Sequence, residues 1–156
     1  MKALTLTSPW AEAVVRFGKR VENRSWPLPE GFLGERIALH QGKKFDAVSA
    51  LWIADLVSKG EDAERDRIVR ELEASTTGAI LGVVRFRSIR RMISPVPPEW
   101  PSAIGDWACG PWLWEIDEVV ALRSPVPCRG MQRLWNLPLR IEREVERQLA
   151  EKERSR

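Results

Sequence analysis

The sequence predicts a single α+β domain in which short strands alternate with helices. Segments of alternating apolar and polar residues, typical of half-buried strands, are separated by segments with apolar residues at helical spacing. The chain has 156 residues, of which 44% are hydrophobic, enough to bury a core without a metal or disulfide bonds. We find no internal repeat. We expect a core domain at 1–137 and a C-terminal helix at 138–156 that packs on it or extends from it.

The N-terminal segment predicts a strand, a helix and a second strand. Residues 3–7 alternate between apolar and polar side chains. Ser8 is a suitable N-cap, and Pro9 suits the first position of a helix. Gly18 would end this helix in the left-handed position that favours glycine. Residues 21–24 then predict a short strand.

Side chains in an extended segment at 19–26 would alternate between two faces. Three residues would share one face with Glu22, namely Arg20, Arg24 and Trp26. The opposite face would carry Lys19, Val21 and Asn23. The flanking arginines would hold the Glu22 carboxylate in its ionised form.

The next segments predict a loop and a strand that ends in polar residues. Residues 27–34 contain two prolines and two glycines, which is typical of a loop. Residues 36–41 predict a strand that runs into a Gly-Lys-Lys sequence. His40 and Lys43 would lie at the end of this strand, where functional side chains are often found.

Two helices are predicted in the middle of the chain. Asp46 would cap a helix that runs to Lys59 and ends at Gly60. Its inward-facing residues would be Val48, Leu51, Trp52 and Leu56. A second helix at 61–74 is rich in charge, so we expect a solvated outer face. Its inward-facing residues would be Ile68, Val69 and Leu72.

A long strand and a tryptophan-rich loop follow. Residues 79–93 predict a strand in which Gly82 marks a bulge or a close approach of another backbone. The segment at 94–110 contains Trp100 and Trp107 and is too long for a simple connection, which favours a flap.

The C-terminal part predicts a further strand, a turn and the last helix. The strand at 111–122 would carry four residues on one face, namely Trp112, Trp114, Ile116 and Glu118. Proline-rich residues 123–130 predict a turn. Asn136 would cap the helix, with Pro138 in its first turn. Its apolar line would be Ile141, Val145 and Leu149, and we expect 151–156 to fray.

Positive charge is concentrated in parts of the chain, although the net charge is only +3. Residues 123–140 contain four arginines and no acid, and four more arginines lie between residues 85 and 91. Such patches suit partners that carry phosphates. The alternative is an ordinary mixed surface. The eight tryptophans also fit a surface on which bases stack.

The composition also indicates which classes of protein to exclude. No apolar run approaches the roughly 20 residues that span a bilayer, and the N-terminus does not resemble a signal peptide. We therefore expect a cytoplasmic protein with no membrane partner. Cys109 and Cys128 lack a CxxC spacing, and one histidine cannot complete a zinc site with them. We expect two reduced packing thiols, no metal and no cofactor.

Several short motifs occur in a particular order along the chain. They are Ser-Pro-Trp-Ala at 8–11, Gly-Lys at 18–19, Glu-Asn-Arg-Ser-Trp at 22–26 and Ala-Leu-His-Gln-Gly-Lys at 38–43. Later motifs lie at 78–84, 110–114, 125–130 and 134–135. Together they resemble the ASCH domain of the PUA-like superfamily. The match spans nearly all of the chain except the last helix.

The resemblance implies a PUA-like fold, a small, partly open mixed β-barrel flanked by helices, with a basic cleft. The family is linked with binding of RNA or other nucleic acids, and some members are enzymes. One enzymatic branch resembles an amidohydrolase of acylated cytidine and uses a lysine, which Lys19 matches, and a threonine three residues later. Glu22 occupies that later position. The threonine nucleophile is therefore absent, and we do not transfer this activity.

We therefore predict a module that binds RNA, or a single-stranded or modified nucleotide, in a basic cleft that contains tryptophan. Lysine and arginine would hold phosphates, tryptophan would stack a base, and Glu22 or Asn23 would read the base edge. The predicted contacts are Trp10, Lys19, Glu22, Arg24, Trp26, His40, Lys43 and Arg129.

Two other functions remain open at this point. The first is a hydrolase acting on RNA or a modified nucleoside, of the ribonuclease or amidohydrolase kind, with Lys19 and Glu22 as the catalytic candidates. The second is a protein-interaction module that uses the tryptophan-rich segment at 94–114 as its docking surface.

Overall fold

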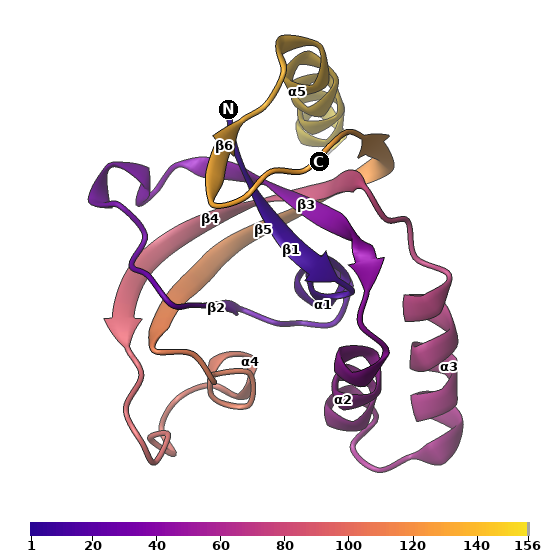
Figure 1. Ribbon diagram of the computed structural model, residues 1–156, viewed down its shortest axis with the longest axis vertical. Coiled ribbons are helices and arrows are strands. Elements are labelled where there is room, and N and C mark those ends of the chain that lie inside the picture. The colour runs from indigo at the N-terminus through magenta and orange to yellow at the C-terminus, as the bar shows by residue number, and fades with distance from the viewer. Residues whose placement is uncertain (156) are drawn as a thin grey trace.

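The structure, a computed structural model, describes residues 1–155. Its strands form one mixed sheet in the order β2-β5-β4-β3-β1-β6, with helices packed around it (Figure 1). This confirms the predicted α+β class with a partly open barrel. The strands are β1 (Lys2–Ser8), β2 (Val21–Arg24), β3 (Arg36–Phe45), β4 (Ala79–Arg91), β5 (Trp112–Pro127) and β6 (Leu134–Asn136). The helices are α1 (Trp10–Arg16), the 3-10 helix η1 (Glu30–Phe32), α2 (Ala47–Ser58), α3 (Asp62–Glu73), α4 (Ser102–Gly105) and α5 (Leu139–Arg154).

The sheet is open at a seam between β1 and β2. β1 pairs with β3 along most of its length, but β6 covers its other side only from Lys2 to Leu4. β2 pairs with β5 on one side only among the described residues. The second half of β1 and the outer side of β2 therefore face each other without a shared ladder. We call this gap the seam.

Three apolar clusters hold the fold together. The first lies inside the curved sheet, where Phe86 and Trp114 meet edge to face with their ring centroids 5.4 Å apart. In the second, α5 packs on the sheet through Val145 and Leu149. The third lies between the sheet, α2, α3 and the 94–110 segment. The helices and the 94–110 segment thus cover the sheet on several sides, and the seam remains accessible.

The orientation of α2 differs from the sequence prediction. Val48 is 76% exposed, and the predicted inward-facing Leu51 and Trp52 are also exposed. The buried residues are Ala50, Ile53, Ala54 and Ser58. Most positions of α2 are apolar, so two different stripes satisfy helical spacing. The stripe of smaller residues is the one that fits between α3 and the sheet.

β5 is longer than predicted and runs through the proline-rich segment expected to be a turn. Pro127 pairs with Ala79, and Val126 pairs with Ile80. β2 covers the other side of β5 only as far as Glu115, so the later part of β5 is an edge strand. Prolines are tolerated in edge strands because the missing N–H need not join a ladder.

The face of β5 also changes along its length. Trp114 and Ile116 contribute to the inner cluster as predicted, but Val119 follows them there instead of Glu118. The ladder with β4 shifts in register next to Ile116, which moves Glu118 to the surface beside Arg36. The predicted irregularity at Gly82 is present, and a Cβ atom there would lie 2.8 Å from the Val120 carbonyl oxygen.

The predicted helix caps are wrong at two positions. The Ser8 hydroxyl has no partner among the described residues, and α1 begins after Pro9 without a side-chain cap. Asn136 lies in β6, and α5 begins after Pro138. The helix continues to Arg154 and includes most of the segment predicted to fray; the last residue of that segment, Arg156, lies outside the described residues.

No helix among residues 1–155 combines the length and apolar character needed to cross a membrane. The cytoplasmic location stays a prediction. In the same residues, no group of three or more histidine, cysteine, aspartate or glutamate side chains is placed to hold a metal ion.

Candidate functional site

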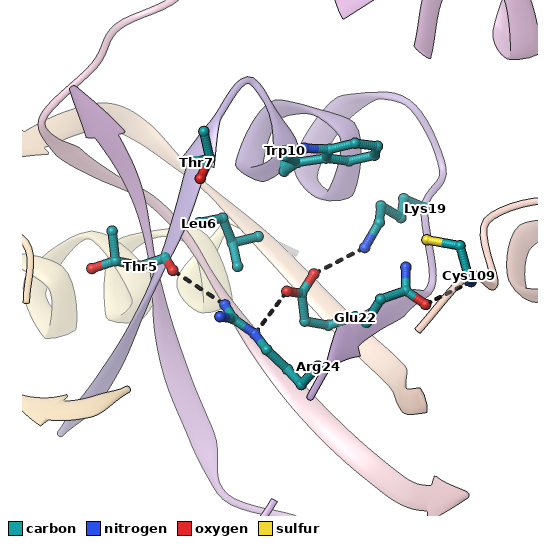
Figure 2. A pocket seen from close by; sticks show the side chains of 9 residues that line it. Thr5, Leu6, Thr7, Trp10, Lys19, Glu22, Arg24 and Cys109 are labelled. Atoms are coloured by element: carbon teal, nitrogen blue, oxygen red, sulfur yellow. Dashed lines mark hydrogen bonds and ion pairs between the residues drawn. The ribbon is translucent and has the colours of Figure 1, made fainter. Parts of the chain in front are cut away.

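A cavity of about 330 Å³ opens at the seam between β1 and β2 (Figure 2). We call it the seam pocket. β1, the start of α1, β2 and the 94–110 segment all contribute to its walls. Its lining residues are Thr5, Leu6, Thr7, Trp10, Lys19, Glu22, Asn23, Arg24 and Cys109. Four of the predicted site residues, Trp10, Lys19, Glu22 and Arg24, are therefore brought together.

A chain of charges crosses the pocket from α1 to β1. The Lys19 ammonium lies 2.9 Å from one carboxylate oxygen of Glu22, and the other oxygen lies 2.9 Å from Nε of Arg24 (Figure 2). Nη2 of Arg24 donates to the backbone carbonyl of Thr5 at 3.1 Å. Lys19 is only 1% exposed and Glu22 7%. Arg24 thus bridges the seam, and the buried carboxylate holds two cations in place.

The partner of Glu22 differs from the prediction, because Lys19 takes the place expected for Arg20. Gly18 ends α1 with a φ of 78°, and the amide of Lys19 still bonds back to Ala13. Lys19 therefore belongs to the helix end and not to the strand, so strand alternation does not govern its direction. The Arg20 guanidinium turns away and donates to the Val14 carbonyl at 3.0 Å.

The Trp10 indole forms an aromatic wall of the pocket. The Lys19 ammonium lies 5.7 Å from the centre of this ring, within the range of a cation–π contact. Trp52 of α2 packs against Trp10 with 5.6 Å between ring centroids, and Trp107 packs against Trp52 at the same distance. Three tryptophans from separate segments therefore support one side of the site.

Asn23 anchors the 94–110 segment and is not free to read a base edge as predicted. Its side-chain oxygen accepts from the amides of Cys109 and Gly110 at 3.0 and 3.1 Å. Its side-chain nitrogen donates to the Trp107 carbonyl at 2.9 Å. These three bonds pin the end of the predicted flap beside β2.

Cys109 is exposed and lines the seam pocket, so the prediction that it is a packing thiol is wrong. Partial burial of the sulfur raises the pKa of the thiol. The neutral thiol is a poor nucleophile compared with the thiolate. The Cys109 side chain therefore offers the pocket a polarisable surface and no activated nucleophile. Burial also raises the pKa of the Cys128 thiol, which is half-buried as a packing residue would be.

Trp26, another predicted contact, does not line the seam pocket. Its ring packs edge to face against Trp114 at 4.7 Å, and its backbone carbonyl accepts from the Trp114 indole. The position is one of structural support for the inner cluster.

His40 lies beneath a second cavity and is 1% exposed. Its Nε2 lies 3.1 Å from the Cys128 carbonyl, to which it donates, whereas Nδ1 is buried with no partner in residues 1–155. A Cβ atom on Gly130 would come within 2.5 Å of Nδ1, so the glycine backbone covers the imidazole. Burial lowers the pKa of His40 more than the bond to Cys128 raises it. His40 therefore supports the 128–130 loop from below.

The two remaining predicted contacts, Lys43 and Arg129, line this second cavity and not the seam pocket. Both side chains are exposed. The cavity has a volume of about 860 Å³ and lies between the end of β3 and the 127–132 segment; we call it the loop pocket. Thr5 of β1 lines both the seam pocket and the loop pocket.

Thr5 and Thr7 are site residues that sequence reasoning missed. Thr7 pairs with neither β3 nor β6 in the described ladders, and Thr5 pairs only with His40 of β3. The N–H and C=O groups of one strand residue point to the same side, and this direction alternates along the strand. The Thr5 carbonyl reaches Arg24 across the seam, so the backbone of Thr5 faces the pocket, and Thr7 lines the pocket at the irregularity between Leu6 and Ser8. Only the strand order reveals this free edge.

The tryptophan-rich segment at 94–114 exposes less aromatic surface than predicted. Trp107 and Trp114 are buried, with 5% and 0% exposure. Trp100 and Trp112 are half-buried, and each lies 5.0 Å from an arginine guanidinium, that of Arg90 and Arg91 respectively.

No protein-family model matches the sequence, and no curated protein matches it. The structure is similar to the crystal structure of ASCH from Zymomonas mobilis, with a TM-score of 0.52 over 94% of this chain and 93% of that one. Crystal structures of two point mutants of the same protein match with TM-scores of 0.50, covering 94% of this chain and 94% and 96% of theirs. The sequence identity is 12% in each case, so the likeness shows the fold.

Proposed function

Because this chain has the fold of the ASCH domain, a PUA-like fold, we propose that its seam pocket binds a nucleotide of RNA or of another single-stranded or modified nucleic acid. The observation that carries the proposal is the content of the pocket. A buried carboxylate flanked by two cations lies beside an exposed strand edge and an indole ring. These are the groups that hold a flat, polar heterocycle with an attached phosphate.

Each group has a role in this proposal. Trp10 provides the apolar wall along the base, and base–aromatic contacts contribute about 1–3 kcal/mol. The backbone groups of Thr5 and Thr7, with the Glu22 carboxylate, meet the base edge. Arg24 forms an ion pair with Glu22 and donates one Nη2 hydrogen bond to Thr5, and the rest of its fork remains for a phosphate. The pocket volume of about 330 Å³ suits one nucleoside.

A hydrolase is the second candidate, because Lys19 and Glu22 share the pocket. The Lys19 ammonium donates to the Val21 carbonyl and to Glu22, and it faces the Trp10 ring. These contacts occupy the Lys19 nitrogen fully. Lys19 therefore has no free approach to a substrate as a nucleophile. Binding is therefore the function that the geometry supports better.

We test the proposal by titrating the four ribonucleoside 5′-monophosphates into the protein at low salt while recording amide and indole NMR signals. We expect shifts at the Thr5 and Thr7 amides and at the Trp10 indole. Arg24→Gln removes the charge but keeps a polar side chain, and we expect it to weaken nucleotide binding roughly tenfold or more, because a hydrogen bond to a charged group is lost.

The matched control is Arg147→Gln on α5, which removes an arginine whose guanidinium is likewise paired with glutamates but lies outside the seam pocket. Its affinity should equal that of the wild type. If no nucleotide shifts the three signals, the proposal is wrong. Chromatography of the same samples tests the hydrolase: a ligand that is consumed by the wild type but not by Lys19→Met would make the pocket an active site.

A further inference from the structure

A basic groove continues from the seam pocket along the free edge of β1. A third cavity, of about 320 Å³, lies between the seam pocket and the loop pocket, and we call it the middle pocket. It shares Thr5, Leu6, Thr7 and Arg24 with the seam pocket. It shares Thr5, Gly42, Lys43, Met131 and Gln132 with the loop pocket. The three cavities therefore form one continuous groove with Thr5 at its centre.

The middle and loop pockets are lined by cations without any acidic residue. Arg24, Lys43, Lys44 and Arg133 line the middle pocket, and Lys43 and Arg129 line the loop pocket. Lys43, Lys44, Arg129 and Arg133 are exposed, and within residues 1–155 none of them forms an ion pair.

The exposed arginines elsewhere on the molecule are of two kinds. Arg67 and Arg147 each contact two carboxylates, whereas Arg70 and Arg140 form no ion pair within residues 1–155 and line none of the three cavities. The unpaired cations of the groove come from the β3 end and the 127–133 segment, which are far apart in the sequence. A surface of this kind lacks a counterion and is suited to a partner that carries several negative charges.

The far wall of the groove is held in place. The His40 imidazole donates to the Cys128 carbonyl, and Gly130 packs directly over the ring. The Trp135 indole donates to the Thr5 hydroxyl at 3.1 Å, which ties β6 to β1 under the same loop. Arg133 adopts a left-handed backbone conformation with a φ of 58°. The 127–133 segment, which carries Arg129 and Arg133, is therefore held in place by these contacts.

We propose that this groove binds the backbone of a single-stranded oligonucleotide, one base of which occupies the seam pocket. The inference rests on the proposed function. Successive phosphates on the side of the bound base that faces the loop pocket would meet Arg24 and then Lys43, Lys44, Arg129 and Arg133. A duplex does not fit this arrangement, because a base edge paired with a complementary strand cannot meet the free edge of β1. The ligand is therefore a strand of several nucleotides and not an isolated nucleotide.

The test compares each ribonucleoside 5′-monophosphate with the homopentaribonucleotide of the same base by isothermal titration calorimetry over a range of NaCl concentrations. We expect the pentanucleotide to bind at least about tenfold tighter at low salt. Each additional phosphate contact should add about 0.7 to the steepness of the log–log salt dependence. Lys43→Gln and Arg129→Gln should each weaken pentanucleotide binding more than mononucleotide binding and reduce the salt slope.

Arg70→Gln is the control, since Arg70 is an exposed arginine of α3 that lines none of the three pockets. It should leave both affinities and the salt slope unchanged. If the pentanucleotide binds no tighter than the mononucleotide and has the same salt slope, the groove is not a strand-binding surface, although the proposed function stands. If neither ligand binds, the proposed function itself fails. Equal binding of a pentaglutamate peptide or of an RNA duplex would also overturn the assignment to a single strand.

Discussion

Lys19 shows how much of the candidate site depends on one buried side chain. Its ammonium is almost entirely removed from solvent, so a carbonyl, a carboxylate and an indole must replace the water. Glu22 in turn forms an ion pair with Arg24, and Arg24 donates a hydrogen bond across the seam to the Thr5 carbonyl of β1. A buried pair of this kind contributes little net stability, but it fixes the direction of each member. The polar groups of the pocket are therefore in place before a ligand arrives.

His40 predicts a dependence of stability on pH. Burial lowers its pKa in the folded protein, whereas the unfolded chain keeps a value of about 6.5. Below that pH the unfolded state binds more protons than the folded state, so the free energy of unfolding falls. Above it, the contribution of His40 to stability is complete. We expect urea denaturation to show that the wild type loses stability relative to His40→Gln as the pH falls from 7.5 to 5.5.

The comparison with His40→Gln removes the effect of other groups. Burial raises the pKa of Glu12, which acts with the opposite sign because its protonation favours the folded state as the pH falls. This contribution is present in both proteins and cancels in their difference. A difference in stability that stays constant between pH 7.5 and 5.5 would show that the His40 environment does not disfavour its charge.

The residues of the site were predictable to different degrees. Trp10, Lys19, Glu22 and Arg24 were predicted together because their motifs lie close in the sequence. Thr5 and Thr7 were missed because their contribution is a free backbone edge, which the order of the strands creates. Trp26 has the same residue type as Trp10, and only the packing against Trp114 distinguishes their positions.

At the scale of single elements, α2 predicts a clear order of mutational effects. Ile53 is fully buried among α1, α3 and β2, whereas Leu51 is 41% exposed. Ile53→Ala should lower the free energy of unfolding by about 2–5 kcal/mol, since it leaves a cavity in the core. Leu51→Ala should cost less than about 1 kcal/mol. Urea denaturation followed by circular dichroism measures both.

The two leucine-sized residues make each variant the control of the other, because both substitutions remove similar side chains from the same helix. The sequence alone predicts the reverse order, with Leu51 inside. If Leu51→Ala lowered the free energy of unfolding more than Ile53→Ala does, the sequence-based orientation of α2 would be right and the observed packing wrong. The same comparison shows why a largely apolar helix is hard to orient from its sequence, whereas α3, with its charged face, was oriented correctly by Ile68 and Leu72.

The extent of β5 illustrates a second limit at this scale. Its prolines argue for a turn as long as the strand is taken to be central. The prediction changes once the neighbours are known, because β2 begins at Val21, opposite Glu115, and so leaves the later part of β5 at the edge. Local residue preferences thus identified most elements, but their boundaries depended on partners that the sequence does not state.

At the scale of the whole molecule, the seam results from the order of the strands. β6 covers only the first residues of β1, and the bridge from Arg24 to Thr5 replaces a ladder in the remainder. The curved, partly open sheet was predictable from the resemblance of the motifs. The position of the opening was not, because it depends on the length of β6, a strand of three residues.

The relation of α5 to the rest of the molecule provides the last prediction. The predicted division into 1–137 and 138–156 leaves open whether this helix packs on the domain or extends from it. In the structure, Val145 and Leu149 are buried against the sheet, and Gln148 exchanges hydrogen bonds with the backbone of Ser124. Figure 1 shows α5 beside β6 and the N-terminus. We therefore expect one cooperative unfolding transition for helix and sheet together.

Leu149→Ala tests this expectation, because it should lower the free energy of unfolding by about 2–5 kcal/mol. Circular dichroism at the helix band and tryptophan fluorescence, which reports on the sheet and its core, should shift to the same new midpoint. Glu146→Ala on the exposed side of α5 is the control and should change stability by less than about 0.5 kcal/mol. A helix that merely extended from the domain would respond differently. Leu149→Ala would then reduce the helix signal and leave the fluorescence transition where it was.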